Sequence, residues 1–268
     1  MENSRLVDFL MALLEVKNLT EQFDGLVAVD DFSFSINKGS ITALIGPNGS
    51  GKTTVFNLIT GFLKIQRGEV YYKDKNIKNL VPHQIAQRGI SRTFQKIRLF
   101  PQLTVLENML LAIKYDTGDS ISTALFRPDI MKKEDDRNKE KALELLNLLN
   151  LFHKKDDLAQ NLSHGQQKLL ELGRTFATDA DLILLDEPTA GVFPEMRLKI
   201  LNLIQDLKNK NKTILFIEHD MRVVMGAAEH IVVMNFGKKI AEGSPDEIKN
   251  NDHVIEAYLG GRGKKRAS

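Results

Sequence analysis

The clearest chemical pattern of the chain is the octapeptide Gly46-Pro-Asn-Gly-Ser-Gly-Lys-Thr53. Its three glycines permit backbone angles that are closed to other residues, so successive N–H groups can point toward one anion. Lys52 adds a full positive charge for the β- and γ-phosphates, and the hydroxyl of Thr53 suits Mg²⁺. The octapeptide predicts a loop that binds the phosphates of a nucleotide.

The residues on either side of this loop predict the elements that would position it. Residues 40–45 form a short apolar run with β-branched side chains, which is typical of a buried strand. Residues 54–61 predict a helix that ends at a glycine. The N-terminus of that helix would add unpaired donors and a partial positive charge to the anion site.

An acidic pair, Asp186 and Glu187, ends the apolar run that begins at Leu182. Open α/β sheets bind their ligands at the carboxyl ends of such strands. Buried carboxylates need a cation, and Mg²⁺ at the phosphate loop would supply one to Asp186. Glu187 would then orient or deprotonate the attacking water. The alternative is a structural pair that caps the next turn.

The stretch Leu162-Ser-His-Gly-Gln166 precedes a predicted helix at residues 167–177. Ser163 therefore has the position of an N-cap. These five residues are equally consistent with a cap alone and with a second phosphate site, in which Ser163 and the N–H of Gly165 reach the γ-phosphate.

Composition limits the class of protein. The 268 residues are 42% hydrophobic, carry a formal net charge of +2 and include no cysteine, so a large core is possible and disulfides are excluded. The charge does not call for a nucleic-acid partner. No apolar stretch approaches membrane-spanning length, and residues 6–14 predict a packed helix or strand. We expect a cytosolic protein, or one peripheral to a membrane.

Alternating strands and helices predict a parallel sheet flanked by helices. The loop between the first two strands would contain Phe23 and Gly25. The expected helices occupy residues 82–88 and 194–209, and the hairpin pairs 231–234 with 238–241. The other expected strands are residues 14–19, 32–36, 68–73, 90–94, 182–187 and 213–217.

The spacing of apolar residues changes between residues 101 and 179. It is helical at 104–112 and 132–150, whereas residues 115–130 are irregular. We therefore expect an α/β core at 14–100 and 180–259, a helical subdomain at 101–179, and a basic, disordered tail at 260–268.

Taken together, the motifs resemble those of ATP-binding cassette (ABC) ATPases, and the resemblance covers residues 14–259. The motifs, in order, are Gly46–Thr53, Gln95, Leu162–Gln166, Leu185–Pro188 and His219. Within that superfamily the chain is most similar to the LivG-type ATPase subunits of branched-chain amino acid importers. The stretches that carry this likeness are residues 92–108, 217–221 and 248–259.

The resemblance implies an α/β P-loop NTPase core, with a mixed sheet flanked by helices, an antiparallel β subdomain and an inserted helical subdomain. It implies ATP and Mg²⁺ as cofactors. Phe23 would stack on adenine, Gln95 would contact Mg²⁺ and the attacking water, and His219 would bond the γ-phosphate. The implied catalytic residues are Glu187, His219 and Gln95, and the implied metal ligands are Thr53, Gln95 and Asp186. The implied nucleotide-binding residues are Phe23, Gly46, Pro47, Asn48, Gly49, Ser50, Gly51, Lys52, Thr53, Thr54, Ser163, Gly165 and Gln166.

Partners follow from the same resemblance. Two cassettes, identical or different, would pair head to tail, and an apolar groove with Leu99, Phe100 and Pro101 would grip integral membrane permease subunits. A substrate-binding protein would act indirectly, and the chain would lie at the cytoplasmic face of the cell membrane. ATP between the two cassettes would favour the closed pair, and hydrolysis would release it.

Two residues depart from the family pattern. His164 stands where the motif more often has glycine, although Gly165 is kept. Phe193 stands where relatives usually carry asparagine, in a loop that crosses between cassettes, and this predicts weakened coupling between the two sites.

Other functions remain open at this point. A urea or short-amide importer shares the architecture, and the ATPase subunit does not touch the cargo. An ABC ATPase that acts on ribosomes or DNA usually has two cassettes or a long coiled coil, which this sequence lacks. A P-loop kinase or GTPase would have no use for Leu162–Gln166.

Overall fold

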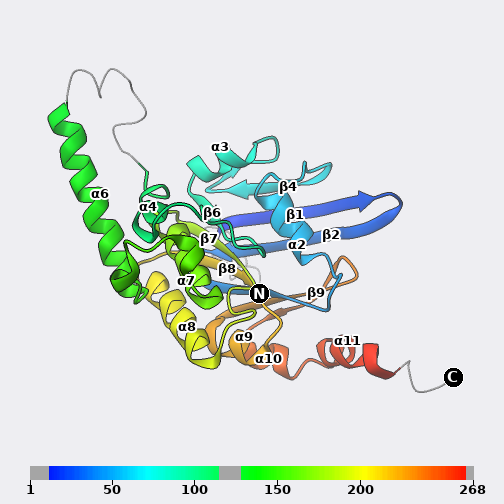
Figure 1. Cartoon of the computed structure of the whole chain (residues 1–268). Helices are drawn as coiled ribbons and strands as arrows, with labels where there is room; N and C mark the ends of the chain where they lie inside the picture. The colour runs from blue at the N-terminus through cyan, green and yellow to red at the C-terminus, as the bar shows by residue number, and fades with distance from the viewer. Residues whose placement is uncertain (1–11, 115–127, 264–268) are drawn as a thin grey trace. The chain divides into compact units, whose positions relative to one another are not determined.

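The computed structural model describes residues 12–114 and 128–263, which form two compact units (Figure 1). The first unit comprises residues up to Arg92, residues 181–190 and residues from Arg197 onward. The second comprises residues 93–180 and 191–196. The expected division at residues 101 and 179 is thus close to, but not the same as, the division by contacts.

An antiparallel sheet in the first unit has the order β2-β1-β4-β5. Its strands are β1 Ala12–Phe23, β2 Leu26–Asn37, β4 Arg67–Tyr72 and β5 Lys75–Asn76. The first two strands are longer than expected, because only Asp24 and Gly25 connect them, both with positive φ (44° and 88°). Phe23 therefore ends β1 and does not lie in a loop.

A second sheet has the order β10-β9-β3-β8-β7-β6. All neighbours are parallel except β9 and β10, which form the expected hairpin. Every residue of β3, β7 and β8 is buried, as their apolar sequences predict. The strands are β3 Ile41–Ile45, β6 Ile90–Arg92, β7 Leu182–Asp186, β8 Thr213–Ile217, β9 His230–Asn235 and β10 Lys238–Gly243. Strand β6 ends two residues earlier than expected, where the chain enters the second unit.

One hydrophobic core joins the two sheets through helix α2 (Lys52–Ile59), which follows the phosphate loop. Val55, Phe56 and Ile59 of this helix are fully buried, with Phe32 of β2 and Leu215 of β8 in the same cluster. The remaining helices that contribute to this unit are α3 Pro82–Gln87, α8 Pro194–Asn209, α9 Met221–Ala227, α10 Pro245–Lys249 and α11 Asp252–Gly263.

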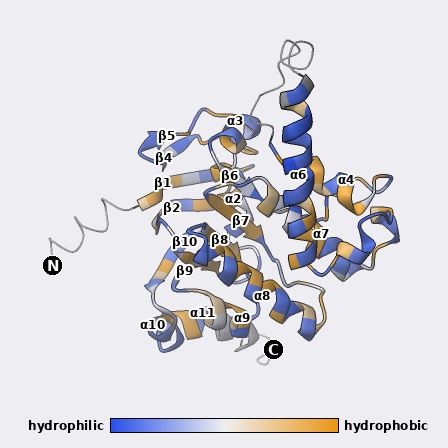
Figure 2. Cartoon of the chain, turned by 90° about the vertical axis from the view of Figure 1, so that its left-hand side faces the viewer, coloured by the Kyte–Doolittle hydropathy of each residue, from blue (hydrophilic) through white to orange (hydrophobic). Residues whose placement is uncertain are grey.

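The second unit is helical, as expected, with α4 Val105–Leu110, α6 Pro128–Leu148 and α7 His164–Ala177. Figure 2 shows that α6 is largely hydrophilic, and its buried contacts come from a stripe that includes Ala142 and Leu146. A Cβ at Gly173 of α7 would lie 2.3 Å from Leu149, so the glycine permits close helix packing. Helix α6 begins four residues earlier than expected, and residues 115–127 lie outside the described part.

Two further expectations concern the chain ends and membranes. Helix α11 continues to Gly263, whereas we expected a disordered tail from residue 260. The tail begins with two glycines, which weaken a helix but do not by themselves end one. Residues 264–268 and 6–11 are outside the description, while residues 12–14 belong to β1. Across residues 12–114 and 128–263, no helix has the length and apolar character needed to cross a bilayer.

Candidate functional site

The phosphate loop connects β3 to α2 and takes a conformation that demands glycine. Gly46 and Gly51 have φ values of 153° and 106°. A Cβ at Gly46 would lie 1.9 Å from the carbonyl oxygen of Met234, and one at Gly51 would lie 2.3 Å from that of Ala28. Since backbone atoms cannot yield as a flexible side chain can, these glycines fix the path of the loop.

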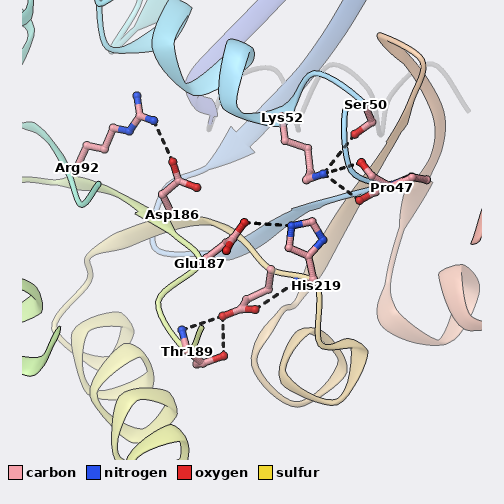
Figure 3. A network of polar contacts seen from close by, with 10 residues as sticks. Pro47, Ser50, Lys52, Arg92, Asp186, Glu187, Thr189 and His219 are labelled. Carbon is pink, nitrogen blue, oxygen red and sulfur yellow. Dashed lines mark hydrogen bonds and ion pairs between the residues drawn. The ribbon is translucent and has the colours of Figure 1, made fainter. Parts of the chain in front are cut away.

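Lys52, the first residue of α2, reaches back over the loop (Figure 3). Its Nζ donates to the carbonyl oxygens of Gly46 and Pro47, each at 2.9 Å, and lies 3.3 Å from Oγ of Ser50. Burial lowers the pKa of Lys52, while the nearby carboxylates of Glu187 and Asp186 oppose that shift. The loop thus holds a buried ammonium group at its centre, where an anion would be attracted.

The start of α2 leaves its backbone donors available. Its N-cap is Gly51, which has no side chain to cap the first turn. Thr53 is exposed and Thr54 half-buried, while Asn48 and Gly49 are exposed at the outer part of the loop. An anion at this helix end would meet unpaired N–H groups.

Asp186 ends β7 beside a cation that the sequence analysis did not identify. Arg92, at the end of β6, places its guanidinium 3.0 Å from the Asp186 carboxylate, and both side chains are almost fully buried. The same guanidinium donates to Asn57 at 2.7 Å and to Thr60 at 3.1 Å. We had assigned the compensating cation to Mg²⁺ alone. The available signal was an arginine within the predicted strand at residues 90–94.

Glu187 and His219 meet at the carboxyl ends of two adjacent strands, β7 and β8 (Figure 3). The Nε2 of His219 lies 3.1 Å from Oε1 of Glu187. Glu187 has a φ of 49°, an uncommon conformation for a residue with a side chain, and its N–H donates to the carbonyl oxygen of Ile217. Strain of this kind is often found at functional sites.

Glu218, which the sequence analysis also missed, fixes this arrangement. Its buried carboxylate accepts hydrogen bonds from the N–H of Thr189 at 2.8 Å, from the Thr189 hydroxyl at 2.6 Å and from the N–H of His219 at 3.1 Å. The turn after β7 is thereby tied to the turn after β8. A carboxylate directly before His219 was the only signal in the sequence.

Phe23 lies at the end of β1, with 40% of its surface exposed. The neighbouring side chains of Leu26 and Val27 across the turn are also exposed, at 71% and 42%. An exposed aromatic ring offers a face on which a flat base could stack.

The remaining predicted residues belong to the second unit. Ser163 is the N-cap of α7, as expected. Its Oγ accepts from the N–H of Gln166 at 3.4 Å, and its own N–H donates to the Gln166 side chain at 3.0 Å. This capping box starts the helix at His164, three residues before the expected start. Gly165 is half-buried, and Gln95 is exposed in the segment that follows β6.

A glycine-lined loop before a helix, with an acidic pair at the carboxyl edge of a parallel sheet, defines a P-loop nucleotide-binding ATPase. Comparison with known families narrows this class. The ABC transporter family model matches residues 29–190, and the model named branched-chain amino acid ATP-binding cassette transporter matches residues 238–264. The chain belongs to the ATP-binding cassettes of ABC transporters.

Individual relatives and solved structures are also ATP-binding cassettes of ABC transporters. The chain is 40% identical to the high-affinity branched-chain amino acid transport ATP-binding protein LivG of Salmonella typhimurium, over 92% of this chain and 98% of that protein. It is 42% identical to a probable branched-chain amino acid transport ATP-binding protein LivG of Archaeoglobus fulgidus, over 93% of this chain and 96% of that protein. A crystal structure of the ADP conformation of MJ1267, an ATP-binding cassette of an ABC transporter, matches this chain with a TM-score of 0.80 at 40% sequence identity. The match covers 93% of this chain and 99% of that chain.

Proposed function

We propose that the chain is the ATP-hydrolysing subunit of an importer for branched-chain or closely related amino acids. The observation that carries the substrate class is the match of residues 238–264 to the branched-chain family model, supported by relatives of that name. The phosphate loop, Lys52 and the Glu187–His219 pair support ATP hydrolysis as the source of energy.

Mg²⁺ fits the oxygen donors of this site. The Thr53 hydroxyl, the Asp186 carboxylate and the Gln95 amide oxygen are hard ligands of the kind that this ion prefers. Within residues 12–114 and 128–263, no three acidic or histidine side chains gather to hold a metal. Phosphate oxygens and water would therefore complete the set. When bound, the ion would neutralise charge on the phosphates.

Glu187 is the general base in this proposal. Its carboxylate accepts the proton of the attacking water, and His219 holds the carboxylate in place and reaches the γ-phosphate. Lys52 and the loop amides orient the β- and γ-phosphates, and Phe23 stacks on adenine. Asp186, held by Arg92, would be a ligand of the metal ion.

The active form is a head-to-tail pair of cassettes, in which Ser163, Gly165 and Gln166 of one copy face the phosphate loop of the other. In the segment around Leu99, Phe100 and Pro101, the Phe100 ring is 49% exposed and available to a membrane permease. The subunit would work at the cytoplasmic face, with a substrate-binding protein acting on the permease.

Uptake by whole cells tests this proposal. Deleting the gene is expected to abolish uptake of labelled leucine, isoleucine and valine, and a plasmid copy should restore it while a copy carrying Glu187→Gln should not. Loss of urea uptake alone would favour the short-amide importer. Intact uptake of both, with the protein recovered on ribosomes, would refute a transport function.

A further inference from the structure

Helix α11 brings a tyrosine hydroxyl to the phosphate loop. The helix packs against β10, and Val254 anchors it with 5% of its surface exposed. Tyr258, one turn further on, points its hydroxyl into the protein, where the oxygen is buried beside the backbone amide of Gly46. Among the described residues this oxygen has no partner that meets hydrogen-bond geometry.

The Gly46 amide belongs to the phosphate loop, which residues in the C-terminal part of the chain also contact. The N–H of Gly237, in the β9–β10 turn, donates to the carbonyl oxygen of Ser50 at 3.0 Å. The carbonyl oxygen of Met234 lies against Gly46 so closely that no side chain fits there. Residues 234–258 therefore contact the loop at Gly46 and at Ser50, and Tyr258 lies within the residues that the branched-chain family model matches.

The hydroxyl acts here as a neutral group. Burial raises the pKa of Tyr258 to about 12, and the Gly46 amide opposes that shift in part. Below that pH the phenol carries its proton and no charge, and its oxygen can still accept a hydrogen bond from an N–H group. A buried hydroxyl without such a partner costs free energy, and each one in a folded protein calls for an explanation.

We propose that Tyr258 is a positioning residue for nucleotide binding: when the loop closes on phosphate, the N–H of Gly46 completes a hydrogen bond to the Tyr258 oxygen. The bond stabilises the nucleotide-bound loop and links helix α11 to the occupancy of the site. The inference rests on nucleotide binding at Gly46–Thr53. It adds a contact from the C-terminal helix that the phosphate-loop motif does not contain.

Tyr258→Phe tests the proposal, because it removes only the hydroxyl. Without nucleotide, the melting temperature is expected to equal or exceed that of the wild type, since an unpaired buried polar group is lost. The dissociation constant for ADP is expected to rise about 3- to 10-fold, the range for one neutral hydrogen bond. Tyr71→Phe is the matched control, because that hydroxyl bonds Glu69 on β4; its affinity for ADP should be unchanged.

A lower melting temperature without nucleotide, together with an unchanged affinity for ADP, would show a purely structural role and overturn the proposal. Hydrogen exchange of residues 252–263 gives a second measurement on the wild type alone. ADP is expected to slow exchange in this helix, and no change would also overturn the proposal. Failure of the wild type to bind ADP would instead refute nucleotide binding itself.

Discussion

The Nε2 of His219 lies 3.1 Å from Oε1 of Glu187. Glu187 directly follows β7, and His219 is the second residue after the neighbouring strand β8. Glu218 ties the two turns together through its hydrogen bonds with Thr189 and the His219 N–H. The orientation of the Glu187 carboxylate therefore depends on the end of β8 as well as on the end of β7, where the acidic pair lies.

Replacing Glu187 with glutamine is expected to lower the rate of ATP hydrolysis by about 100- to 10,000-fold, because the amide cannot accept the proton of water. ATP binding should persist, and the variant should accumulate as an ATP-bound dimer. Steady-state hydrolysis and size-exclusion chromatography with ATP measure both. Glu195→Gln, on the first turn of α8, serves as the control. Substantial residual turnover would move the base to another residue.

His219→Ala is expected to reduce hydrolysis by roughly 10- to 100-fold, less than loss of the base itself, because the base remains but is no longer held. The effect should be on kcat more than on the affinity for nucleotide. His153→Ala, at an exposed histidine of the second unit, is the control. An unchanged kcat would mean that the contact with Glu187 has no part in turnover.

Lys52→Ala is expected to weaken nucleotide binding by on the order of 10- to 100-fold, the range for a hydrogen bond to a charged group. The side chain supplies the loop's only full positive charge, and its ammonium also bridges the carbonyl groups of Gly46 and Pro47. Isothermal titration with ADP measures the change. Lys38→Ala, at an exposed lysine before β3, should bind as the wild type does.

Phe193 is 85% exposed in the loop that precedes α8. If this ring weakens coupling between paired cassettes, Phe193→Asn should raise the Hill coefficient of ATP hydrolysis toward about 2, the number of sites in a pair. Substrate-saturation curves of the two proteins provide the measurement. Unchanged cooperativity would refute the hypothesis.

Glu171 of α7 provides a prediction about pH. Burial raises the pKa of this carboxyl, although Lys168, the N–H groups of Arg98 and Phe94, and Arg174 lower it in part. At low pH the group is protonated in both the folded and the unfolded chain. Once the pH exceeds the raised pKa, the folded chain holds a buried carboxylate, so the free energy of unfolding is smaller.

The variant Glu171→Gln keeps the shape and stays neutral. Its melting temperature relative to the wild type should therefore be higher at about pH 7.5 than at about pH 4.5. Thermal denaturation at both values measures the difference. Glu140→Gln, at an exposed site on α6, should show no such dependence on pH. A difference of the opposite sign would mean that the partners of the carboxylate outweigh its burial.

Local patterns in the sequence were enough to predict several features. The phosphate loop was evident because its glycines, Lys52 and Thr53 are contiguous, and the N-cap at Ser163 because a cap and its helix are neighbours. The buried strands β7 and β8 were evident from apolar runs of four residues each. By contrast, Phe23 was misplaced, because whether a turn has two residues or more depends on strand pairing.

The sequence by itself determined the class of protein, the nucleotide loop and the parallel sheet, since each rests on residues close together along the chain. Only the tertiary structure decided which distant groups meet there. Arg92 and Asp186 are 94 positions apart, and Tyr258 reaches Gly46 from the last helix. Such contacts depend on the order of strands in the sheet and on the packing of helices against it, which no local pattern encodes.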